Sequence, residues 1–368
     1  MPTVIAVFIM ALTGIMILPP DASAADWLTY HYDNARDGAN TNEVVLTPAN
    51  VNTNDFFKLF TYTVDGEVYA QPLYMANVAI AGQGTHDVLF VATENDTVYA
   101  FDADSNAGTN GGLLWHTNLG IAATSVLFGT RYYHNVLNPL LGITGTPVID
   151  PVTKTLYVDV LTTPVSDTTN AQHHVHALNI ADGTERPFSP VLVAASVPGT
   201  GVDSSNGVVT FNANQEDSRP ALTLAGGVLY VSFGSFGDTD PFHGWVIGFN
   251  ATNLVQMTNC VFCTTPNANT NVFGVNAGEA ALWMGETDSA LMPAAIFILK
   301  PETEVSAPTP MAGTMGTLSS SFPLPTGSQW PIILHPWTRP PMRSMTMTSA
   351  RVAHACCRIR RETQRIRI

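Results

Sequence analysis

The chain has 368 residues, of which 45% are hydrophobic and only 12% are charged, and it contains 28 glycines and 25 prolines. This composition is typical of a strand-and-turn protein and argues against long, solvated helices. The formal net charge of −14 argues against nucleic acid and anionic membranes as partners.

Residues 1–24 predict an export signal. Residues 4–18 form an apolar stretch interrupted only by Thr13 and Gly14, and Ala-Ser-Ala at residues 22–24 fits a cleavage site. The segment has no Lys or Arg, and a misassigned start codon is the alternative. It is too short to span a bilayer comfortably, and no other segment is suited to crossing one. We therefore expect a secreted, periplasmic or cell-envelope protein without a membrane span in the mature chain.

Three short strand-like runs follow one another at residues 89–92, 98–101 and 113–116. They are rich in β-branched and aromatic residues, and Asn, Asp and Gly separate them. Weaker copies of the pattern follow at residues 156–158 with 175–179, and at residues 229–231 with 246–250. Strands this short need stacked copies to bury a face, so the pattern predicts a repeat protein.

A proline in a strand-like run precedes each unit. Pro72, Pro147 and Pro220 recur at intervals of 75 and 73 residues. A nearly constant period across irregular loops indicates one supersecondary unit that is repeated.

The repeat resembles that of the quinoprotein-type β-propellers, whose blades carry Val-Tyr-Ala-x-Asp-x-x-x-Gly-x-x-x-Trp. Residues 98–102 (VYAFD) with Trp115 fit it, and residues 27–51 resemble the opening of the family. Residues 70–74 (AQPLY) and 243–248 (HGWVIG) are similar to secreted bacterial quinoprotein-like members. The resemblance implies an all-β fold, a β-propeller of four-stranded antiparallel blades, over residues 25–285. About three blades and part of another are present, whereas propellers close with four to eight.

The remaining chain departs from the pattern. Residues 286–334 keep no strand-turn rhythm, and residues 335–368 hold eight arginines against one acid, Glu362. We interpret 286–334 as a degraded or out-of-frame continuation and 335–368 as an aberrant, disordered basic tail, so that the chain is a truncated or frameshifted product. A basic tail that binds an anionic partner is the alternative.

Long connections at residues 121–143, 159–174 and 186–211 are expected to gather with the turn at 94–96 and the loop at 232–245 on one face of the blades. This loop face is the predicted binding surface for a small molecule, a glycan or a protein.

Two groups of residues are candidates for a metal site. His174 and His176 alternate along a strand, so they face the same side and could share a metal with a carboxylate from another loop. In the alternative, His176 only replaces an aromatic residue of the repeat. Asp238 and Asp240 could bind calcium, although they lack the Gly and Glu of an EF-hand loop, and an Asp-rich turn is the alternative.

Catalytic candidates are His243 and Glu94. His243 beside Trp245, at the mouth of a funnel, could act as a base or stack a ligand. The resemblance adds Glu67, Gln71 and Asn95, because acid and amide groups of this kind hold calcium and the quinone in catalytic quinoproteins. A turn is the alternative role for Asn95 together with Asp96.

The cysteines do not decide the function. Cys260 and Cys263 form a single CxxC, which predicts a local disulfide or a pair of free thiols and not a structural zinc site. Cys356 and Cys357 resemble the vicinal pair of quinoprotein alcohol dehydrogenases, but they lie in the basic tail outside any blade, and the matching region has no adjacent cysteines.

The sequence therefore predicts an exported, quinoprotein-like binding or scaffold module. The alternative is a dehydrogenase of an alcohol or sugar that depends on pyrroloquinoline quinone and calcium, in which calcium polarises the quinone and a carboxylate or His243 accepts the substrate proton. Motifs of hydrolases, NTPases and nicotinamide dehydrogenases do not occur in a strand-to-helix context.

Overall fold

The computed structural model describes residues 25–41, 43, 46–52, 56, 58–124, 140–165, 170–237, 241–269, 281–282 and 365–367. Every regular element within these residues is a strand. The predicted export signal and the segment 286–334 lie outside the described residues.

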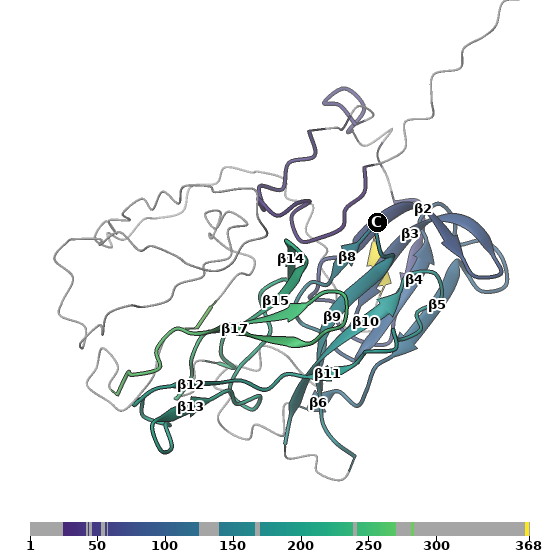
Figure 1. Ribbon diagram of the computed structural model, residues 1–368. Coiled ribbons are helices and arrows are strands. Elements are labelled where there is room, and N and C mark those ends of the chain that lie inside the picture. The colour runs from purple at the N-terminus through teal and green to yellow at the C-terminus, as the bar shows by residue number, and fades with distance from the viewer. Residues whose placement is uncertain are drawn as a thin grey trace, which may run out of the picture.

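Three four-stranded antiparallel sheets form the body of the structure (Figure 1), and in each the strands follow one another in chain order. The first blade consists of β2 (Leu73–Ile80), β3 (Gly84–Ala92), β4 (Thr97–Asp102) and β5 (Leu113–Asn118). The second consists of β8 (Val148–Asp150), β9 (Thr155–Thr162), β10 (Gln172–Asn179) and β11 (Val191–Leu192). The third consists of β14 (Thr223–Ala225), β15 (Val228–Phe233), β16 (Trp245–Asn250) and β17 (Gln256–Cys263). The prediction of an all-β fold with four-stranded antiparallel blades is confirmed, and the arrangement is that of an incomplete propeller.

Three two-stranded sheets complete the described elements. β6 (Ala123–Thr124) pairs with β7 (Leu140–Leu141), and β12 (Ser196–Pro198) forms a hairpin with β13 (Val208–Thr210). β1 (Thr61–Thr63) pairs with β18 (Arg365–Arg367), so the described residues of the basic tail form a strand. No sheet within the described residues closes on itself.

The second blade packs on both of its neighbours. Leu156, Val158 and Val160 of β9 belong to the core shared with the first blade, whereas Tyr157 belongs to the core shared with the third. Successive side chains of a strand point to opposite faces, and the consecutive apolar residues 156–158 of β9 therefore contribute to both cores.

The recurring prolines mark the entries to the blades. Pro72 and Pro147 directly precede β2 and β8, and Pro220 lies shortly before β14. The entries contact one another, because the hydroxyl of Thr146 accepts a hydrogen bond from the Gln71 amide (2.9 Å), and its carbonyl accepts one from the amide of Leu222 (3.0 Å). The sequence period therefore reflects one structural position repeated in three blades.

Among the described residues, none forms a helix long and apolar enough to cross a bilayer.

Candidate functional site

A layer of buried polar side chains links the three blades. We define this buried polar layer by the seven residues Glu94, Asp96, Asp159, His173, Glu216, Asp217 and His243, all of which are less than 9% exposed. Because buried polar groups need partners, the contacts within this layer decide what its members can do.

Glu94, a predicted catalytic residue, is enclosed between the first two blades. Its Oε2 accepts hydrogen bonds from the amide of Gly142 (2.6 Å) and the hydroxyl of Thr144 (3.2 Å). Burial raises the pKa of Glu94 to about 8, against an ordinary value of 4.5, and the charge of Asp217 contributes in the same direction. The side chain is thus largely protonated at neutral pH.

Asp96 lies in the β3–β4 turn next to Glu94. Neither of its carboxyl oxygens has a hydrogen-bond partner among the described residues, and burial raises its pKa well above the ordinary value. Gly142 packs against it so closely that a Cβ there would lie 2.2 Å from Asp96 Oδ1. Asn95 in the same turn donates from Nδ2 to Asp65 Oδ2 (2.9 Å), as a turn residue would.

His173 forms a buried pair with Asp159 that the sequence did not single out. Its Nδ1 lies 2.6 Å from Asp159 Oδ2, and its Nε2 lies 3.0 Å from the carbonyl oxygen of Glu216. Burial by itself lowers the pKa of His173, but the Asp159 carboxylate and the two hydrogen bonds raise it above the ordinary value. Both ring nitrogens of His173 thus lie beside oxygen atoms, and the contact with Glu216 connects the second blade to the third.

His174 and His176 lie on the same face of β10, as predicted, with ring centroids 6.3 Å apart. Each has its own partner, since His174 Nδ1 lies 3.2 Å from Thr162 Oγ1 and His176 Nδ1 lies 2.5 Å from Glu185 Oε1. Within the described residues, no group of three or more His, Cys, Asp and Glu is arranged to hold a metal ion. The other metal candidates, Asp238 and Asp240, lie outside the described residues.

His243 and Trp245 are both enclosed and do not open on a funnel. His243 is 1% exposed, with Nδ1 2.8 Å from Thr265 Oγ1 and Nε2 3.0 Å from Asp203 Oδ1. Trp245 is fully buried and packs at right angles to Phe211. In this arrangement Trp245 has no free face on which a ligand could stack, and both His243 nitrogens are engaged.

The residues suggested for quinone and calcium are distributed over two blades. Glu67 and Asn95 lie near the entry to the first blade, where Glu67 accepts a hydrogen bond from Tyr69 (2.9 Å), and Gln71 accepts one from the His31 amide (3.2 Å). Trp245 lies in the core of the third blade. Trp245 is fully buried and lies in another blade than the three oxygen-bearing residues, so these candidates offer no accessible aromatic floor for pyrroloquinoline quinone.

Cys260 and Cys263 on β17 are free, buried thiols and do not form a disulfide in this structure. Burial raises the pKa of Cys263 to about 12. The thiolate is therefore disfavoured, and the pair has no nucleophilic character.

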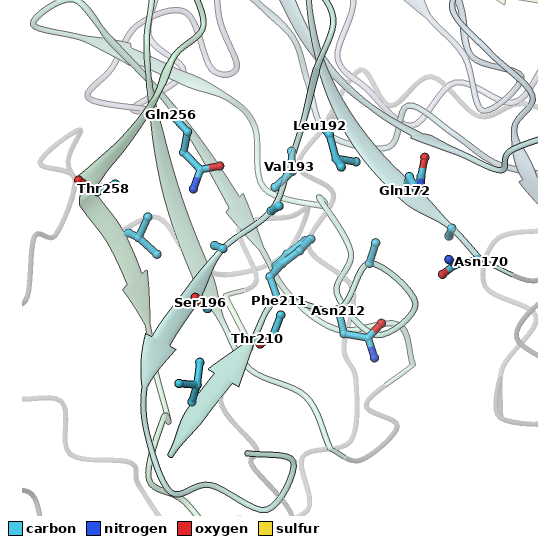
Figure 2. A pocket seen from close by; sticks show the side chains of 16 residues that line it. Asn170, Gln172, Leu192, Val193, Ser196, Thr210, Phe211, Asn212, Gln256 and Thr258 are labelled. Atoms are coloured by element: carbon cyan, nitrogen blue, oxygen red, sulfur yellow. The ribbon is translucent and has the colours of Figure 1, made fainter. Parts of the chain in front are cut away.

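A pocket of about 620 Å³ opens between the second and third blades, and none of the candidate site residues named from the sequence lines it. Figure 2 shows Phe211 at its centre, with β12 and β13 on one side and Gln256 and Thr258 of β17 beside them. The lining residues are Asn170, Ala171, Gln172, Leu192, Val193, Ala194, Ala195, Ser196, Val208, Thr210, Phe211, Asn212, Ala213, Gln256, Thr258 and Val261. None of these side chains is ionisable.

The pocket uses part of the predicted loop face. Half of its lining residues come from the connection 186–211, and Asn170, Ala171 and Gln172 come from the end of the connection 159–174. The individual residues escaped prediction because amides, hydroxyls and small apolar residues scattered over loops carry no motif. Only the length of the two connections signalled a functional region.

Comparison with known proteins gives a distant likeness of fold. No protein-family model matches the chain, and no curated protein matches it in sequence. Among solved structures, the chain is similar to a quinohemoprotein alcohol dehydrogenase from Pseudomonas putida, with 15% identity and a TM-score of 0.42 over 66% of this chain and 27% of that one. It is also similar to a europium-containing methanol dehydrogenase, with 12% identity and a TM-score of 0.40 over 65% of this chain and 32% of that one. The chain thus spans about a third or less of the length of these two structures.

Proposed function

We propose that this chain is an exported binding module on a quinoprotein-like propeller frame, with the neutral pocket between the second and third blades as its ligand site. The observation that carries the proposal is the pocket itself. Its volume of about 620 Å³ lies within the range of about 300–1,000 Å³ that is usual for small-molecule sites. It also combines an apolar floor with several polar side chains, as such sites do.

The arrangement of the titratable groups supports binding over catalysis. The acids whose pKa values are raised most strongly, Glu94, Asp96, Glu216 and Asp217, belong to the buried polar layer. His243 and Glu94 are both engaged in hydrogen bonds. The pocket, in contrast, contains no side chain able to act as a general acid or base. The dehydrogenase alternative finds no support in a specific contact among the described residues.

A thermal-shift screen of neutral, polar small molecules tests the proposal. At a concentration of one hundred times Kd, a ligand of the native state stabilises it by about 2.7 kcal/mol. We expect compounds that raise the Tm of the chain and lose this effect in Thr210→Trp, which places a large side chain on the exposed pocket face of β13. Thr85→Trp, an exposed threonine on β3 in the first blade, is the matched control and should retain the effect.

Two results would contradict the proposal. One is that Thr210→Trp leaves all ligand-induced shifts intact, which would place the site elsewhere. The other is alcohol or sugar oxidation by the chain after addition of pyrroloquinoline quinone and calcium, which would favour the dehydrogenase.

A further inference from the structure

The hydrogen-bonding capacity of the pocket restricts its ligand, provided that the proposed binding function holds. Five lining side chains make no hydrogen bond to another described residue: Gln172, Ser196, Thr210, Gln256 and Thr258. They offer hydroxyl and amide groups, each of which both donates and accepts. A matching ligand must also carry several groups that donate and accept.

The rim of the pocket is held in place around these free groups. The Asn214 side chain accepts a hydrogen bond from the Ala171 amide (2.9 Å) and donates one to Asn170 (3.3 Å), while its backbone amide donates to Asn212 Oδ1 (3.0 Å). These bonds fix the loop 212–214 against the start of β10. A pre-organised rim reduces the conformational entropy that a ligand must offset.

The floor of the pocket is apolar and rigid. Phe211 packs edge-to-face against Phe233, with centroids 4.7 Å apart, and against His173, at 6.0 Å. Val193 and Ala195 of the neighbouring segment are buried beside it. The floor therefore presents a fixed apolar patch below a ring of uncharged polar groups.

Other classes of ligand fit this lining less well. A purely apolar ligand would desolvate the polar side chains without replacing their hydrogen bonds, at about 1–3 kcal/mol for each group. A charged ligand would lose water without gaining a counter-charge, since none of the lining residues is ionisable.

We propose that the pocket binds a neutral carbohydrate, with its hydroxyls on the free amides and hydroxyls of the rim and an apolar C–H face of a sugar ring on Phe211. Figure 2 shows Gln256 and Gln172 on opposite sides of the central Phe211, so a carbohydrate that contacts both amides must extend across this ring. A neutral sugar also avoids repulsion from a chain with a net charge of −14.

Isothermal titration calorimetry of the full chain with cellotriose, maltotriose and N-acetylchitotriose tests this inference, with trigalacturonate as the charged comparison. We expect at least one neutral trisaccharide to bind and trigalacturonate not to bind. Gln172→Met and Gln256→Met each remove an amide at nearly constant size and should weaken binding about three- to tenfold, as loss of one neutral hydrogen bond does. Gln83→Met, in the β2–β3 turn of the first blade, should leave Kd unchanged.

The outcomes separate this inference from the proposed function. The neutral trisaccharides could fail to bind while other neutral compounds bind and lose their binding in Thr210→Trp. That result would overturn the carbohydrate assignment and leave the proposed binding module in place. Preference for trigalacturonate, or binding that survives both glutamine substitutions, would overturn it as well. If neither sugars nor other compounds bind, both proposals fail.

Discussion

At the scale of single residues, the buried carboxyls dominate the electrostatics of the structure. Burial raises the pKa of Glu94 to about 8, that of Asp217 to about 7 and that of Glu216 to about 9. Desolvation is the first cause in each case, because a low-dielectric interior disfavours the ionised form. At neutral pH Glu94 and Glu216 are therefore mainly protonated, whereas Asp217, with a pKa close to 7, is protonated only in part.

Such groups make the fold less stable as the pH rises from about 4.5 to about 8. For Glu94, the unfolded chain loses its proton near pH 4.5, whereas the folded chain keeps it up to about pH 8. Between these values the folded state binds more protons, so the free energy of unfolding falls as pH rises, by at most about 1.4 kcal/mol per pH unit for one group. Glu94→Gln, which mimics the neutral side chain, should flatten this decline between pH 4.5 and 8.

Urea unfolding at a series of pH values measures this effect. The control is Asp182→Asn, which removes a carboxyl from an exposed turn and should leave the slope near that of the natural chain. An equal slope in Glu94→Gln and the natural chain would show that Glu94 is ionised in the folded state.

At the scale of elements, the β12–β13 hairpin is an insertion that forms one wall of the pocket. Its loop is tied to the third blade by a hydrogen bond from the Gly201 amide to the carbonyl of Pro266 (2.8 Å) and by the contact of Asp203 with His243 (3.0 Å). Gly199 is needed at this junction, since a Cβ there would lie 2.3 Å from the same Pro266 oxygen. His243 thus acts as an anchor of the pocket wall.

Removal of that anchor should loosen the hairpin. In Asp203→Ala the His243 Nε2 contact is lost, and we expect the opening free energy of the hairpin to fall by about 1 kcal/mol, which corresponds to roughly fivefold faster amide exchange. Hydrogen exchange followed by mass spectrometry reports this for residues 196–210. Amides of β3 and β4 serve as the internal reference, and unchanged protection in the hairpin would contradict the anchoring role.

At the scale of the whole molecule, stability depends on contacts between blades. Trp115, the tryptophan of the repeat, donates from Nε1 to the Ile180 carbonyl of the second blade (2.9 Å), and its ring packs against Gly183. Tyr157 in turn donates to the Ala251 carbonyl of the third blade (2.6 Å). Each blade therefore completes the core of its neighbour, as expected of stacked repeats.

Substitution of Trp115 measures this coupling. Trp115→Phe keeps an aromatic ring but leaves the buried Ile180 carbonyl without its donor, and we expect a loss of about 1–3 kcal/mol in the free energy of unfolding. Trp27→Phe is the matched control, because Trp27 Nε1 is buried without a partner among the described residues and its removal breaks no hydrogen bond. A loss from Trp115→Phe no greater than that from Trp27→Phe would contradict the role of the interblade bond.

Local sequence determined the strands, because side-chain alternation and turn residues act over a few neighbours. The runs at 89–92, 98–101 and 113–116 lie in or coincide with β3, β4 and β5, and the weaker copies fall in β9, β10, β15 and β16. The regular spacing of Pro72, Pro147 and Pro220 predicted the three repeated units that form the blades. The β12–β13 hairpin was missed, since its strands have three residues each and lie inside a long connection.

Only the tertiary structure decided the chemistry of the site. The sequence marked His243, Trp245 and Glu94 as reactive by residue type, but packing between blades buries them and engages the His243 nitrogens and one Glu94 oxygen. Asp159 pairs with His173 across 14 residues of chain. The pocket is assembled from three separate segments that span 91 residues, from 170 to 261. The repeat could be predicted because it depends on local sequence. The ligand pocket could not, because its long-range contacts depend on how the blades stack.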